Sequence, residues 1–97
     1  MVFKIYNKNY NVQALVRDIG YKPLGYTDKK ELNCVRALSG DYPRFHVYLS
    51  EAPDIITFSL HLDQKRPVYE GQTAHGGDYE SDIVRGEAQR IKDVILR

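Results

Sequence analysis

Cysteine, tryptophan and long apolar runs are scarce or absent in this sequence. Cys34 is the single cysteine among 97 residues, which excludes an internal disulfide and a zinc site built from paired thiolates. No stretch approaches the roughly 20 apolar residues that a membrane-spanning helix needs, and the opening Met-Val-Phe-Lys lacks the apolar segment of a signal peptide. We therefore expect a cytoplasmic protein that does not contact membranes.

Nucleotide-binding and hydrolase signatures are also missing. The seven glycines form no phosphate-binding loop, and no nucleophile elbow surrounds a serine. Nucleotide-dependent enzymes and serine hydrolases are therefore disfavoured, and whether the chain is an enzyme stays open.

The composition is that of an ordinary globular protein, with 42% hydrophobic and 28% charged residues. Chains of this length rarely hold two cores, so residues 1–97 are predicted to form a single domain. The net charge is +1, but residues 1–50 hold eight lysines and arginines against four acidic residues, whereas residues 51–97 hold six against nine. Such a dipolar surface could steer a polyanion such as RNA to one side.

Two helices follow from the spacing of apolar residues. A helix over residues 12–19 is predicted by apolar side chains at i, i+3, i+4 and i+7, between an N-cap at Asn11 and a stop at Gly20. Residues 64–80 have no periodicity and are predicted to be a long irregular connection. A last, amphipathic helix is predicted to begin after Ser81 as its N-cap.

Three strands are predicted over residues 32–38, 45–49 and 56–62, the last two paired as a hairpin. The buried face of the first of them is not assigned by its pattern. Residues 20–30 contain proline and glycine and are predicted to be a loop. Residues 2–6 alternate and allow an additional N-terminal edge strand.

The resulting fold class is α+β, in the order α-β-β-β-α. It is a three-stranded antiparallel sheet with both helices on one face. Because side chains alternate between the two faces of a strand, matching the apolar faces of the hairpin leaves five polar side chains together on the opposite face. These are His46, Tyr48, Ser59, His61 and Asp63.

A metal site is one hypothesis for this polar face. His61 and Asp63 lie at i and i+2 on one strand, so their side chains point the same way, and His46 lies on the neighbouring strand. Two histidines and one carboxylate suit Zn²⁺ or Fe²⁺, with His75 from the long connection as a fourth ligand.

RNA binding with cleavage is a second hypothesis for the same face. His46 would act as general acid–base, and Arg44 with Lys65 and Arg66 would stabilise the phosphates. Tyr48 would stack on a base. No cofactor is expected for this activity.

Three family resemblances are present; two of them favour the RNA hypothesis, and the third covers most of the chain. The predicted order is similar to that of double-stranded RNA-binding domains. The segments Asp18-Ile-Gly20-Tyr21 and Phe45-His46-Val47-Tyr48 resemble HicA-type toxins, a similarity that implies a ribonuclease with His46 as its catalytic residue. The segments YPRFHVYL, HLDQK, AHGGDY and EAQRI also resemble a family of small bacterial proteins of unknown function.

Three functions are therefore predicted, in order of preference. The first is an RNA-binding protein with HicA-like ribonuclease activity, the second a His/Asp metal-binding module, and the third a protein-interaction adaptor without catalysis. RNA or another protein is the expected partner, and the oligomeric state is not predicted.

Glu87 is an exception within the apolar stripe of the last helix. A carboxylate there needs a partner, and the sequence predicts an ion pair with Arg17 or Arg36 in a structural role.

Overall fold

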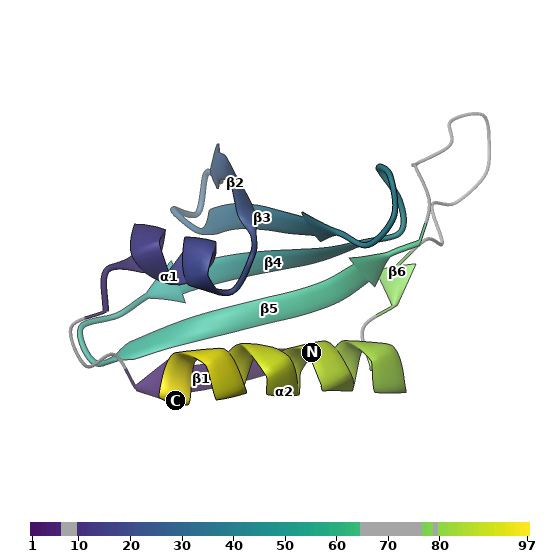
Figure 1. The fold of residues 1–97 in the computed structure, drawn as a ribbon. Helices are drawn as coiled ribbons and strands as arrows, with labels where there is room; N and C mark the ends of the chain where they lie inside the picture. Colours follow the sequence, from purple (N-terminus) through teal and green to yellow (C-terminus); the bar gives the residue numbers. More distant parts are fainter. Residues whose placement is uncertain (7–9, 65–76, 79) are drawn as a thin grey trace.

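The computed structural model of the protein describes residues 1–6, 10–64, 77, 78 and 80–97. Within these residues it is an α+β fold, with an antiparallel sheet and two helices (Figure 1). The elements in chain order are β1 (Val2–Tyr6), α1 (Val12–Asp18), β2 (Lys22–Tyr26), β3 (Leu32–Ala37), β4 (Arg44–Glu51), β5 (Ile55–Asp63), β6 (Gly77–Asp78) and α2 (Asp82–Leu96).

The sheet is larger than the sequence predicts, and the prediction of a three-stranded sheet is wrong. Its strands follow the order β1-β5-β4-β3-β2, and the two-residue β6 also pairs with β5. β1 pairs with β5 because Phe3 and Ile5 stand opposite Phe58 and Ile56, and all four side chains are buried. The predicted additional strand therefore forms and completes the core at this edge of the sheet.

β2 is the strand that the sequence placed in a loop. Pro23 pairs with Cys34 and Gly25 with Asn33, so Leu24 is an extra residue that forms a β-bulge. Proline and bulges are tolerated in strands at the edge of a sheet, where one side of the ladder has no partner. The turn residues thus mark an irregular edge strand.

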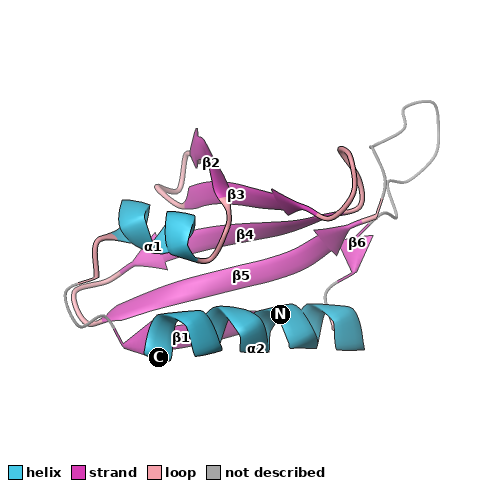
Figure 2. Ribbon diagram, viewed as in Figure 1, coloured by secondary structure: helices cyan, strands magenta, loops and turns pink. Residues whose placement is uncertain are grey.

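Both helices lie on the same side of the sheet, as Figure 2 shows. Asn11 caps α1 by accepting from the backbone N–H of Ala14 at 3.1 Å, and Ser81 caps α2 by accepting from that of Val84 at 3.3 Å, as predicted. Among the described residues, no helix is long and apolar enough to cross a bilayer.

The core fills the space between the helices and one face of the sheet. Phe58 is fully buried, and its ring stacks on Phe3 with centroids 4.9 Å apart. Leu32 and Cys34 settle the orientation of β3, because both are buried on this face. The other buried apolar residues of the strands and helices include Phe45, Val47, Leu49, Leu60, Leu62, Leu15, Val16, Ile19, Val84, Ala88 and Ile91.

Glu87 joins α2 to the rest of the core. Its carboxylate accepts from the Tyr21 hydroxyl at 2.6 Å and from Arg36 at 3.3 Å. Arg90 adds two contacts, at 2.7 and 2.9 Å, and also donates to the backbone oxygen of Ile19. The predicted ion pair with Arg36 is confirmed, and the alternative partner Arg17 does not appear among these contacts.

The predicted irregular connection falls mostly outside the described residues, which omit 65–76 and 79. Its described part includes β6, whose Gly77 and Asp78 pair with Asp63 and Leu62 of β5.

Candidate metal centre

The sheet face opposite the helices, here called the open face, carries the predicted polar side chains. The register of β4 against β5 places three pairs side by side: Arg44 opposite Asp63, His46 opposite His61, and Tyr48 opposite Ser59. Residues alternate strictly along both strands, so all six side chains share this face. The sequence prediction for this face is confirmed.

Asp63 bridges the two histidines. Its Oδ2 lies 3.1 Å from Nδ1 of His46, and its Oδ1 lies 2.9 Å from Nε2 of His61. One donor atom from each of the three side chains lies within 4.8 Å of the other two. The two imidazole rings are tilted by 41°, with centroids 4.8 Å apart.

His46 stands between two oxygen atoms. Its Nε2–H donates to Oδ1 of Asn33 on β3, and its Nδ1 faces the Asp63 carboxylate. Burial lowers the pKa of His46, and the charge of Asp63 opposes this effect without reversing it. A neutral ring with its proton on Nε2 turns the Nδ1 lone pair toward Asp63, where a bound cation would satisfy both groups.

The donor set fits a transition metal. Two imidazoles and one carboxylate are the ligands of many catalytic Zn²⁺ sites and of the facial triad of Fe²⁺ enzymes. Donor atoms on one tetrahedral Zn²⁺, bound at about 2.1 Å, lie roughly 3.4 Å apart. The three donor atoms, all within 4.8 Å of one another, would need to approach by at most about 1.4 Å to reach this arrangement. The Asn33 contact would orient His46, as hydrogen bonds to ligating histidines commonly do.

Arg44 and Tyr48, predicted to bind RNA, both lie beside this cluster. Nε of Arg44 is 3.5 Å from Oδ2 of Asp63, and its guanidinium lies over the ring of Tyr42 at 4.7 Å. The Tyr48 ring stacks on His46, with centroids 4.7 Å apart. Both side chains therefore already pack against neighbours in the sheet.

The remaining predicted site residues, Lys65, Arg66 and His75, lie outside the described residues. His46 is only 9% exposed, and both of its ring nitrogens have partners, so the general acid–base role predicted for it stays a prediction. RNA binding through Arg44, Tyr48, Lys65 and Arg66 stays a prediction.

Asn33 is the site residue that sequence reasoning missed. Leu32 and Cys34 point to the core, so Asn33 shares the open face with His46. The signal was the short alternation of these three residues. Arg36 obscured it, because a charged residue on the core side of β3 made the pattern ambiguous.

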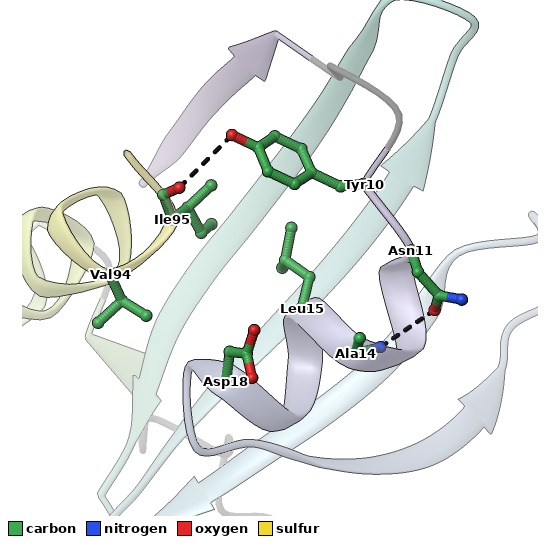
Figure 3. A pocket seen from close by; sticks show the side chains of 7 residues that line it. All are labelled: Tyr10, Asn11, Ala14, Leu15, Asp18, Val94 and Ile95. Atoms are coloured by element: carbon green, nitrogen blue, oxygen red, sulfur yellow. Dashed lines mark hydrogen bonds between the residues drawn. The ribbon is translucent and has the colours of Figure 1, made fainter. Parts of the chain in front are cut away.

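Two pockets are relevant to the choice of site. One, of about 430 Å³, lies on the open face and is lined in part by His61. The other, of about 130 Å³, lies between α1 and α2, where the Tyr10 hydroxyl donates to the backbone oxygen of Ile95 at 3.4 Å (Figure 3). Among the described residues that line it, Asp18 is the one carboxylate and none is a histidine or cysteine, so they offer fewer metal donors.

Comparison of the chain with family models, with curated proteins and with solved structures gives no match, so its resemblance to HicA-type toxins stays a prediction.

Proposed function

We propose that this protein binds a divalent transition metal, Zn²⁺ or Fe²⁺, through His46, His61 and Asp63. The observation that carries the proposal is the convergence of Nδ1 of His46 and Nε2 of His61 on the two oxygens of one carboxylate. Asn33 adds support, because its Oδ1 accepts a hydrogen bond from Nε2 of His46, which orients the ring with Nδ1 toward the Asp63 carboxylate.

Three protein ligands leave coordination positions for water or another molecule. A metal held in this way acts as a Lewis acid and lowers the pKa of bound water. The site is only partly exposed, since the side chains of His46, His61 and Asp63 are 11%, 13% and 23% exposed. Partial burial limits the access of water to the metal ligands and therefore favours tight binding of the ion.

The test is a Zn²⁺ titration of metal-free protein prepared without a histidine tag, read out by thermal unfolding and by the metal content after gel filtration. We expect one ion per chain and a rise in melting temperature. A ligand that binds only the folded state at 100 times its Kd adds about 2.7 kcal/mol to the free energy of unfolding.

His61→Ala and Asp63→Asn should each abolish this rise. Asp54→Asn is the matched control, because Asp54 is an exposed carboxylate in the turn between β4 and β5. His75→Ala tests the fourth ligand expected from the sequence. Unchanged melting of the wild type at saturating Zn²⁺ and, under anaerobic conditions, at saturating Fe²⁺ would contradict the proposal.

A further inference from the structure

Arg44, beside the candidate metal centre, has a hydrogen-bond donor that the fold does not use. Its Nε is buried and has no hydrogen-bond partner among the described residues. Oδ2 of Asp63, 3.5 Å away, is close enough for an ion pair but does not accept a hydrogen bond from this Nε. A buried donor without an acceptor costs free energy, so this N–H group is available to an acceptor that a ligand brings.

The other neighbours of Arg44 hold its side chain without supplying an acceptor to Nε. The guanidinium lies over the ring of Tyr42, 4.7 Å from the centroid, in a cation–π contact that limits its positions. On β3, the residue opposite Arg44 is Ala37, whose methyl group accepts no hydrogen bond. The side chain of Arg44 is 26% exposed, so a ligand can reach it from solvent.

The charges of the open face favour an anionic ligand. Asp63 is the one carboxylate on this face of the described strands. The same strands place three cations there: Lys4, Lys22 and Arg44. The Met1 amino group and the Glu80 carboxylate, 3.6 Å apart, offset one another and leave this difference unchanged.

A bound metal would strengthen this preference. A divalent ion held by two neutral imidazoles and one carboxylate keeps one positive charge, and Arg44 adds a second. An ion bound to Oδ2 of Asp63 at about 2.1 Å would lie within about 5.6 Å of Nε of Arg44. A metal–oxygen bond of about 2.1 Å and a hydrogen bond of about 2.8 Å, made by different oxygens of one anion, are long enough to cover that distance.

We propose, on the basis of the metal-binding function above, that this centre binds a phosphate monoester, with one phosphate oxygen on the metal and another accepting from Arg44. A phosphate monoester carries nearly two negative charges at neutral pH and has three terminal oxygens. It therefore matches the charge of the ion and Arg44 better than a carboxylate or a phosphodiester, each with a single negative charge. Metal ions and arginine are groups that proteins combine to hold phosphoryl oxygens.

The experiment compares methyl phosphate with dimethyl phosphate on Co²⁺-loaded protein freed of unbound ion by gel filtration. Binding is followed by the broadening of the phosphorus NMR signal by paramagnetic Co²⁺, with the metal-free protein as the reference. The two probes differ by one methyl group, and only the monoester has a second negative charge. We expect methyl phosphate to bind at least tenfold more tightly, because it faces two positive charges at short range.

Arg44→Ala should weaken the binding of methyl phosphate about tenfold. Arg44→Lys should restore only part of it, because an ammonium group lacks the planar fork of donors. Lys4→Ala is the matched control, since it removes a cation from the same face at a position opposite Thr57, about 20 Å along β5 from Asp63. Salt screens charges at that distance, so the affinity should change less than twofold.

The outcomes separate this proposal from the metal site itself. Failure of the protein to bind Co²⁺ and Zn²⁺ would overturn both proposals. Metal binding without binding of methyl phosphate would overturn the phosphate proposal alone, as would an affinity for methyl phosphate that Arg44→Ala leaves unchanged. Equal or tighter binding of dimethyl phosphate would also overturn it and would assign the centre to a phosphodiester instead.

Discussion

Two carboxylates on opposite faces of the sheet, Glu87 and Asp63, have different kinds of partners. Glu87 is 3% exposed in its side chain and accepts from two arginines and a tyrosine hydroxyl, groups that keep their protons throughout the physiological range. Asp63 is 23% exposed and faces two imidazoles, whose nitrogens bind either protons or metals. The partners of Glu87 are therefore fixed structural groups. The imidazole partners of Asp63 can exchange a proton for a metal ion.

The largest expected difference is in stability. Glu87→Gln leaves Arg36 and Arg90 near a buried position without their counter-charge, and breaking such a pair costs about 3 kcal/mol. Asp63→Asn, the matched change on the open face, should cost less than about 1 kcal/mol in the presence of EDTA, because the new amide can still hydrogen-bond to the imidazoles and the Arg44 side chain, 26% exposed, stays in contact with water. Urea unfolding of the two variants measures both values. Equal losses would remove the distinction between the two sites.

The second difference is in alkaline stability. Burial, and next the hydrogen bond to Glu87, raise the pKa of Tyr21 well above its ordinary value. The folded state therefore keeps a proton that the unfolded state loses above about pH 10. The free energy of unfolding should fall as the pH rises above 10, by about 1.4 kcal/mol per pH unit for this one group.

Tyr21→Phe should remove that part of the slope between pH 10 and 11, measured by urea unfolding at each pH. Burial also raises the pKa of the Cys34 thiol to about 11, so the comparison is made in a Cys34→Ala background. An unchanged slope in Tyr21→Phe would mean that the Tyr21 hydroxyl ionises in the folded protein as it does in the unfolded chain.

The smallest expected effect concerns Arg44. Its guanidinium stands 3.5 Å from Asp63 and repels an incoming dication, so Arg44→Ala should tighten Zn²⁺ binding by about threefold in a chelator competition assay. Arg85→Ala on the surface of α2 is the control. The RNA hypothesis predicts a different result for Arg44→Ala, a loss of RNA affinity and a weaker salt dependence. Weaker Zn²⁺ binding would instead mean that Arg44 holds Asp63 in position.

The parts of the fold that the sequence predicts are those with long regular patterns. β4 and β5 alternate over enough residues to identify both faces, so the sequence alone predicts that His46, His61 and Asp63 lie together. The two helices have apolar stripes and capping residues, and they begin after Asn11 and Ser81 as expected.

The parts that it does not predict depend on distant partners. In the sequence, Arg36 interrupts the apolar alternation of β3. In the structure it lies on the core side, because its guanidinium donates a hydrogen bond to Glu87, 51 residues later in the chain. β2 is almost wholly exposed, so no apolar alternation reveals it, and only its pairing with β3 makes it a strand. The role of Asn33 depends on which face of β3 is buried. The sequence does not show this, because the charged Arg36 lies on the buried face and its partner Glu87 is far away in the chain.

The irregular geometry of β2 affects how this protein behaves in concentrated solution. Regular outer strands offer a row of N–H and C=O groups on which a strand of another molecule can add. Here Pro23 has no N–H to offer, and the bulge at Leu24 breaks the spacing of the groups that follow. Leu24 and Tyr26 expose apolar surface at this edge, so we expect the irregular backbone to hinder the addition of a strand from another molecule there.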